Sequence, residues 1–285
     1  MASNTAYSQE HAFLNPNQSL VNLNPSFAGS NGFIRNQSSY RSSLNSNYSN
    51  YTASNSFDAY LKPLKAGIAV SALRNNIADI SIHNSFSLSY AQYFSILKGQ
   101  LKLVPSLKLG SEERSTNLPD TWLPLGSVNQ TPAKINYLNV SAGFLATYKN
   151  KLYAGFSIAT LNRQSNNVFL SNRIIDYHVS YNLKFSNNLQ MQFFGRFQTN
   201  VGYTSHNLAA NALLYKHFLV GVGIGRNNLS TFNLGYRNNY FTLLAGCDVQ
   251  KRRPWESYYA RSFELHASFN LRNKLLRETI TSFET

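Results

Sequence analysis

The 285-residue chain has little cysteine, little charge and no long apolar run. Cys247 is its only cysteine, which excludes an intramolecular disulfide framework and a metal site built from several cysteines. No window approaches about 18 uninterrupted apolar residues, so a bundle of membrane-spanning helices is excluded. Charged residues make up only 13% of the chain, against about 25% in a typical soluble domain.

Asparagine, serine and aromatic residues are abundant in place of charged residues. The chain has 36 Asn and 35 Ser, together with 19 Phe and 18 Tyr. An aromatic fraction of 14% supplies far more core-forming surface than disordered chains have. The net charge is nevertheless +14, which indicates an anionic surface or partner. The composition therefore indicates a folded chain that is basic, aromatic and polar on average.

From about residue 82 onward, apolar and polar residues alternate with a period of two. Because successive side chains of a β-strand point to opposite faces, this pattern predicts strands with one apolar and one polar face. About fourteen segments fit, although Ser and Asn blur the alternation in the first two. They are residues 32–41, 50–60, 66–74, 82–96, 100–110, 135–149, 151–161, 173–186, 188–200, 204–215, 217–226, 229–237, 240–250 and 258–272.

The connections between these segments are of two kinds. Tight turns are predicted at Lys98–Gly99, Lys149–Asn150, Asn187–Asn188 and Asn238–Asn239. Longer excursions are predicted at residues 111–134, 162–172 and 251–257. Short turns at one end, long loops at the other and an even strand number are typical of outer-membrane barrels. We therefore expect the turns and both termini on the periplasmic side and the long loops outside the cell.

A soluble β-sandwich also alternates, so charge and strand length must separate the two folds. A charge on the lipid face near mid-membrane costs about 2–4 kcal/mol, so a membrane barrel excludes it there. The charges well inside the later strands all fall on the polar phase: Lys102, Lys108, Asp176, Lys184, Arg196 and Asp248. Several segments reach 12 to 15 residues, whereas sandwich strands have about 5–6.

Aromatic residues gather near segment ends, where a membrane-interface girdle would lie. They are Tyr90, Phe94, Tyr148, Phe185, Tyr236 and Phe241. The sequence therefore predicts an all-β fold, a transmembrane antiparallel β-barrel of about 14 strands over residues 31–272. Residues 1–30 are expected to form a periplasmic or plug-like segment, and residues 273–285 a C-terminal tail. The first residues show neither the basic nor the apolar region of an export signal.

One segment near the N-terminus resembles a known family. Asn24, Pro25, Phe27, Ala28 and Gly29 are similar to the Asn-Pro-x-aromatic-Ala-Gly motif of the PorP/SprF family of type IX secretion system outer-membrane proteins. Further similar segments lie at residues 40–41, 67–71, 88–91, 103–107, 151–157 and 262–269. The resemblance spans about residues 24–272. It departs after Tyr40-Arg41, where many relatives have Gln-Trp and this chain has Ser42-Ser43.

The resemblance implies a non-enzymatic outer-membrane partner of the type IX secretion and gliding machinery, whose signal peptide has been removed. It implies that the barrel docks or anchors an exported surface protein, such as an adhesin, through that protein's C-terminal domain. It also implies contact with a periplasmic, peptidoglycan-associated component. Two alternatives remain open from the residues: a channel for small anionic or apolar solutes, and a soluble lectin-like sandwich.

The polar phase supplies the residues expected to line the lumen. They are Lys102, Lys108, Asp176, His178, Lys184, Arg196, Asp248, Glu264 and His266. Two interpretations of this set remain open. The two histidines form a buried charge network with the neighbouring acidic residues, or they are polar lumen groups whose hydrogen bonds are satisfied. No histidine pair has metal-ligand spacing and no nucleophile–base pair is recognisable. We therefore expect no catalysis, metal or cofactor.

Two further sequence features carry predictions. The run Gly221-Val222-Gly223-Ile224-Gly225 lacks nucleotide-loop spacing, and instead predicts a strand whose lumen-side glycines make room for something close by.

The predicted outer loops hold Trp122, Lys251, Arg252, Arg253 and Trp255. Because Trp and Arg are enriched at binding hot spots, this set is the expected partner surface. Membrane-interface anchoring is the alternative for both tryptophans. Outer-membrane lipids or lipopolysaccharide are further expected partners, and nucleic acid is not.

Overall fold

The computed structural model describes residues 13, 19–44, 50–78, 80–116, 133–159, 174–200, 203–225, 229–250 and 262–271. Nearly all of them lie in strands. The strands are Ile34–Ser43 (β1), Asn50–Leu61 (β2), Ala66–Ile77 (β3), Ser81–Gln92 (β4), Phe94–Ile96 (β5), Leu101–Thr116 (β6), Ala133–Tyr148 (β7), Leu152–Ala159 (β8), Ile174–Lys184 (β9), Leu189–Asn200 (β10), Tyr203–Leu214 (β11), Phe218–Gly225 (β12), Leu229–Arg237 (β13), Phe241–Gln250 (β14) and Ser262–Leu271 (β15).

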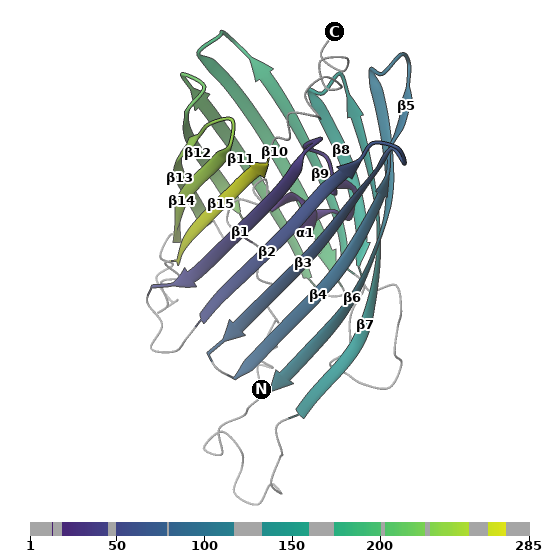
Figure 1. Ribbon diagram of the computed structural model, residues 1–285. Helices are drawn as coiled ribbons and strands as arrows, with labels where there is room; N and C mark the ends of the chain where they lie inside the picture. The colour runs from purple at the N-terminus through teal and green to yellow at the C-terminus, as the bar shows by residue number, and fades with distance from the viewer. Residues whose placement is uncertain are drawn as a thin grey trace, which may run out of the picture.

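These strands form one closed antiparallel barrel (Figure 1). Strands that follow one another in the chain pair with each other, except β4 and β5; β15 pairs with β1, and β4 pairs with β6. Because β4 and β5 both pair with β6 and are separated only by Tyr93, they are one wall strand with a break. The wall therefore has fourteen strands, which confirms the predicted fold. Closure leaves no free edge strand, which a membrane would not tolerate.

The wall has apolar side chains on its outer face and polar side chains on its inner face, the reverse of a soluble protein. In β12, Val220, Val222 and Ile224 point outward and are exposed, whereas Gly221 and Gly223 point into the lumen and are buried. The buried set across the barrel is mainly Ser, Thr, Asn, Gln and charged residues, and the exposed set is mainly Leu, Val, Ile, Phe and Tyr. A surface of this kind is stable in hydrocarbon and not in water.

The two ends of the barrel differ as the sequence predicted. At one end the strands are joined by tight turns with left-handed backbone, such as Lys149 and Asn150 at φ of 49° and 52°. Turns of this hand match the twist of the flanking strands. At the other end β6 and β7 are connected through residues 117–132, and β14 and β15 through residues 251–261. We refer to the short-turn end and the long-loop end below.

One loop boundary was predicted wrongly. Residues 111–134 were expected to be a loop, but β6 continues to Thr116 and β7 begins at Ala133, with Ser115 paired to Lys134. The alternation stops at Ser111 because the following residues are polar on both faces. Glu113, for example, points outward and forms an ion pair with Lys134 at 2.7 Å. Such residues can remain in a strand where both faces meet water, so the wall extends beyond the apolar band here.

The predicted aromatic girdle lies outside the barrel at the short-turn end. Tyr90, Phe94, Tyr148, Phe185 and Tyr236 are all exposed there. Phe241 is half-buried and its ring lies 5.9 Å from that of Tyr236. Aromatic rings at this level are typical of a membrane–water interface.

The core of the molecule lies inside the barrel. Two short helices, Leu20–Leu23 (α1) and Pro25–Phe27 (η2), contact β3, β4, β6 and β7 from within (Figure 1). Their buried side chains pack with inward residues of the wall, among them Ala69, Val104 and Leu145. In the described part of the chain, no helix has the length and apolar character needed to cross a membrane. The segment Ser19–Gly29 therefore fills part of the lumen, and we call it the plug.

Candidate functional site

Asn24 fixes the middle of the plug to the barrel wall. Its side-chain amide donates to the carbonyl oxygens of Phe144 and Phe156, at 3.2 and 3.0 Å, and its Oδ1 accepts from the backbone N–H of Ser26 at 2.9 Å. The residue is fully buried. A Cβ at Gly143 would lie 2.2 Å from Asn24 Oδ1, so glycine is required there for the plug to fit. Asn24 thus connects the plug to two adjacent strands.

The end of the plug is held by a second close approach. The carbonyl oxygen of Ala28 accepts a hydrogen bond from the Tyr93 hydroxyl at 2.7 Å. The same oxygen would lie 1.8 Å from a Cβ at Gly67, so Gly67 allows the two backbones to meet. Tyr93 lies at the break between β4 and β5, and Gly67 is the second residue of β3. Both are close to the tight turns, which places the plug toward the short-turn end of the lumen.

A buried ion pair secures Gly29. The Asp58 carboxylate accepts from the Gly29 backbone N–H at 2.9 Å and from Arg35 Nε and Nη2 at 2.8 and 3.1 Å. Asp58 is fully buried and Arg35 nearly so. Gly29 has a φ of +70°, in the left-handed region that favours glycine. The Asp58 carboxylate therefore neutralises Arg35 and holds the Gly29 end of the plug in a single position.

The remaining residues of the motif pack against the wall. The ring of Phe27 lies 5.4 Å from that of His178, and Pro25 is at the first position of η2, where its missing N–H removes no helical bond. Ser26 shares a hydrogen bond with Ser106 at 2.7 Å. All five residues of the family motif, Asn24, Pro25, Phe27, Ala28 and Gly29, therefore lie in the plug.

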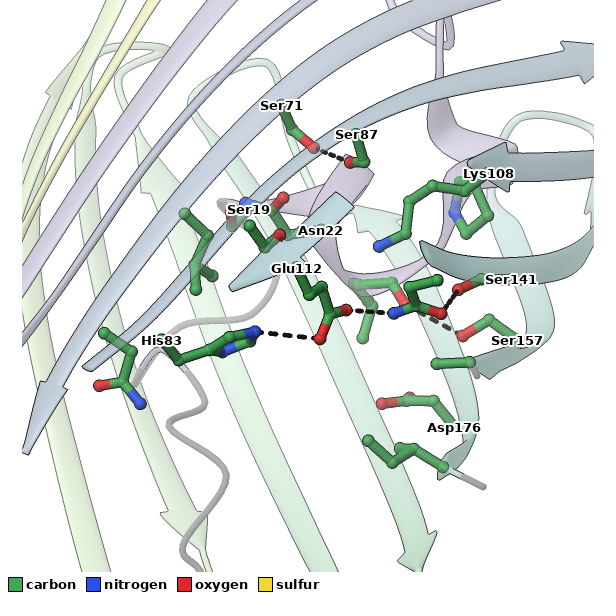
Figure 2. Close-up of a pocket in the computed structure, with 18 of the residues that line it drawn as sticks. Ser19, Asn22, Ser71, His83, Ser87, Lys108, Glu112, Ser141, Ser157 and Asp176 are labelled. Atoms are coloured by element: carbon green, nitrogen blue, oxygen red, sulfur yellow. Dashed lines mark hydrogen bonds and ion pairs between the residues drawn. The ribbon is translucent and has the colours of Figure 1, made fainter. Parts of the chain in front are cut away.

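Beyond the plug, the lumen contains a cavity of about 260 Å³. Its lining includes plug residues such as Ser19 and Asn22, and it extends to Ile77, Ala159 and Ile174 at the long-loop ends of their strands. Figure 2 shows serines around this cavity, with Ser71 and Ser87 hydrogen-bonded at 2.7 Å, and Lys108 among the lining side chains. Its polar lining is suited to hydrogen-bonding a polar chain or group.

Two clusters of charged side chains lie at this cavity. Glu112 accepts from His83 at 3.0 Å and also from Tyr137 and Asn139 (Figure 2). On β9 and β10, Arg196 is paired with Asp176 through Nε at 2.6 Å. Glu112 is bonded through both oxygens within the wall, whereas Asp176 pairs with Arg196 through Oδ2 and its buried Oδ1 has no hydrogen-bond partner among the described residues. Among the described residues no group of three His, Cys, Asp or Glu side chains could hold a metal ion.

The predicted lumen residues lie on the inward phase at different depths. Lys108, Asp176, His178, Arg196, Asp248, Glu264 and His266 lie within the lumen or its lining. Lys102 and Lys184 lie at the short-turn rim instead. Lys102 donates to Asn150 at 3.2 Å, and Lys184 is exposed because it ends β9. Lys184 thus shares the inward phase of Asp176 and His178 but lies at the end of the strand.

The two inward histidines do not form the charge network that their spacing with acidic residues allowed. His266 shares a hydrogen bond with Ser39 at 2.8 Å. His178 contacts Phe27, and within the described chain neither ring nitrogen has a hydrogen-bond partner. Asp248 instead pairs with Arg41 at 3.0 Å and binds Ser262.

The glycines of β12 make room for neighbouring amides. A Cβ at Gly221 would lie 2.0 Å from Asn211 Oδ1 and 2.3 Å from Asn233 Oδ1, on the strands to either side. This confirms the prediction that the glycines face the lumen and make room for a close neighbour. The neighbours are the Asn211 and Asn233 side chains of the two adjacent strands.

Several site residues were missed in the sequence. Arg35, Arg41 and Asp58 lie in the two strands whose alternation was blurred, and Glu112 lay in the supposed loop. Gly67 and Gly143 carry no local signal, because their constraint comes from residues far away in the chain. The predicted loop residues Trp122, Lys251, Arg252, Arg253 and Trp255 lie outside the described residues, as does the tail 273–285.

Comparison with known proteins gives one family and a set of similar folds. The family model described as Type IX secretion system membrane protein PorP/SprF matches residues 2–269. The chain is similar to the CymD monoaromatic hydrocarbon channel, with TM-score 0.56, 9% identity and coverage of 93% of this chain and 95% of that one. It is also similar to the outer membrane protein Omp33 of Acinetobacter baumannii, with TM-score 0.52, 10% identity and coverage of 84% and 96%. Such low identities indicate a shared fold alone. No curated protein matches.

Proposed function

The chain belongs to the PorP/SprF family of type IX secretion system membrane proteins, and from this we propose that it is a plugged receptor for an exported surface protein. It is a β-barrel of the bacterial outer membrane. In the proposal, the C-terminal domain of an exported adhesin docks at the long-loop end. The short-turn end contacts a periplasmic, peptidoglycan-associated component, and the protein carries out no catalysis.

The observation that carries this proposal is the plug. A solute channel needs a continuous aqueous path, whereas Asn24 and Ala28 are fully buried and bonded to the wall near the short-turn end. The cavity beyond the plug extends toward the long-loop end. A lumen that a wall-bound segment partly fills toward one end and that is hollow toward the other suits docking better than conduction.

The position of charge supports the assignment of the two ends. Lys98, Lys149 and Lys151 lie in tight turns at the short-turn end, where anionic periplasmic or headgroup partners can meet them. The sequence places Lys251, Arg252, Arg253 and Trp255 in a connection at the opposite end. Basic and aromatic side chains of this kind are enriched at protein–protein hot spots.

A binding experiment with the purified barrel tests the proposal. The C-terminal domain of a type IX cargo protein is the bait, and binding to the barrel in mild detergent is measured by surface plasmon resonance. We expect Trp255→Ala and a triple Gln variant of Lys251, Arg252 and Arg253 to weaken binding at least about tenfold, as loss of a hot spot does. Lys149→Gln, at the other end, is the matched control and should bind normally.

Conductance separates the receptor from the channel alternative. The wild-type protein in a planar bilayer should be silent under an applied voltage. Steady anion-selective current from the wild type, together with no affinity for any cargo domain, would establish the channel and overturn the receptor. Co-purification from envelopes under mild detergent adds a second check, because an isolated barrel without envelope partners contradicts the proposal.

A further inference from the structure

The connections at the short-turn end carry charge of one sign. Six connections lie there, β2–β3, β5–β6, β7–β8, β9–β10, β11–β12 and β13–β14, and each has an exposed basic residue in it or directly beside it. We call these six residues the basic rim: Lys65, Lys98, Lys149, Lys184, Lys216 and Arg237. From two residues before each connection to two residues after it, all within the described chain, there is no Asp or Glu. Asp58, which precedes the first connection, is fully buried and paired with Arg35. The rim therefore attracts anions.

Each residue of the basic rim is adjacent in the chain to a large apolar side chain. These six neighbours are all exposed: Leu64, Leu97, Tyr148, Phe185, Tyr215 and Tyr236. Lys149 shows the arrangement, since its ammonium nitrogen lies 5.3 Å from the centroid of the exposed Tyr148 ring. A basic group beside an exposed apolar one is suited to a membrane–water interface, where the apolar part enters the bilayer and the charge stays at the headgroup level.

The backbone of the turns does not account for the lysines. Lys65, Lys98, Lys149 and Lys216 have φ between 47° and 64°, in the left-handed region. Glycine and asparagine adopt this conformation most readily and are the usual residues of such turns. Lysine at four positions where the turn favours another residue indicates a role for its charge.

The distribution of the rim around the wall distinguishes two kinds of anionic partner. Because the strands follow chain order around a closed barrel, the six connections are spaced around its whole circumference. A soluble acidic protein that covers one part of this ring would leave the apolar neighbours elsewhere in water, which is unfavourable. A phospholipid leaflet surrounds the barrel on every side and offers an apolar layer and phosphate groups together. Since the short turns of outer-membrane barrels face the periplasm, this leaflet is the periplasmic one.

We propose that the basic rim binds the phosphate groups of anionic phospholipids in the periplasmic leaflet. At each connection the apolar neighbour enters the edge of the bilayer, and the basic side chain beside it reaches a phosphate at the headgroup level. An anionic lipid is preferred over a zwitterionic one because its phosphate has no cation of its own to compete with the rim. Lipid binding at the rim is independent of cargo docking at the long-loop end, and it holds the barrel at one depth in the membrane.

The lipid preference of the reconstituted barrel tests the proposal. The purified protein is placed in phosphatidylcholine nanodiscs that contain a trace of spin-labelled phosphatidylglycerol or spin-labelled phosphatidylcholine. Electron paramagnetic resonance then measures the protein-bound fraction of each label. We expect the wild type to bind phosphatidylglycerol about fivefold more strongly at low salt, which corresponds to about 1 kcal/mol for one headgroup at one basic residue. Added salt should reduce the preference by screening.

Two matched variants separate the charge of the rim from the fold of the turns. The first replaces the four left-handed lysines by asparagine: Lys65→Asn, Lys98→Asn, Lys149→Asn and Lys216→Asn. Asparagine suits these turns, so the barrel should fold, and we expect the lipid preference to fall by at least about half. The second variant has arginine at the same four positions and should keep the wild-type preference. Heat-modifiable migration on gels verifies that both variants are folded.

The results that contradict lipid binding are specific. Equal binding of the two lipids by the wild type, or a preference that the asparagine variant keeps, overturns the proposal. The wild type could also show no lipid preference while the asparagine variant loses an acidic periplasmic protein on co-purification from envelopes. That result would assign the rim to a protein partner and likewise overturns the proposal.

Discussion

Replacing Gly143 by alanine should release the plug without changing any plug residue. The new Cβ would lie 2.2 Å from Asn24 Oδ1 and 2.8 Å from Ser106 Oγ, distances that no relaxed side chain tolerates. Asn24 would then lose its hydrogen bonds to Phe144, to Phe156 and from Ser26. At about 1 kcal/mol for each of three bonds the plugged state weakens by roughly 3 kcal/mol. This corresponds to a factor of about one hundred in its population.

Two assays read this change. In planar bilayers Gly143→Ala should show intermittent current where the wild type is closed, and its heat-modifiable gel shift should occur at a lower temperature. Gly195→Ala is the matched control, because its Cβ would contact only Leu208 and Val179, both at 3.4 Å on the outer face. A Gly143→Ala variant that stays closed and melts like the wild type would refute the reasoning.

The remaining predictions concern the lumen and the wall. Asp58→Asn removes the counter-ion of buried Arg35, and breaking such a pair should destabilise the barrel by about 3–5 kcal/mol relative to the wild type, measured by unfolding in urea. Gly221→Ala drives a Cβ into the Asn211 amide and should lower stability by about 1–3 kcal/mol; unchanged unfolding would show that the amides can move aside. Val222→Lys places a charge on the outward face of β12, and a loss of about 2–4 kcal/mol in vesicle-based unfolding is expected. A neutral result for Val222→Lys would mean that this position lies outside the hydrocarbon.

The wall could be predicted from the sequence because it depends on a local rule. A strand with lipid on one side and a polar lumen on the other must alternate, and the alternation in β9 or β15 is visible without any long-range information. The alternation rule gave wrong predictions where the outward face of a strand is not apolar. Glu112 and Glu113 extend a strand beyond the apolar band, and Asn36 and Ser38 place polar groups on the outward face.

The sequence left open whether residues 1–30 face the periplasm or plug the lumen, and no local rule predicts how the plug is held. Its anchors are far away in the chain, since Asn24 binds Phe144 and Phe156 and Ala28 binds Tyr93. No spacing rule connects such positions. The glycines at 67 and 143 show the same limit, because each is explained by an atom of the plug rather than by its own strand.

The position of the plug in the chain constrains how the barrel is assembled. Residues 19–29 precede every strand, and the contacts that hold them include β2–β4 and β6–β9, whereas Ser30 and Asn31, which follow, bond to β1 and β15 at the seam. A finished cylinder would have to admit this segment end-on and desolvate Asp58 and Arg35 in a confined space. A sheet still open at that seam can instead curl around a segment already seated against it. We therefore expect biogenesis to proceed by wrapping, with a segment made before the strands acting as an internal template and β15 closing the wall over it.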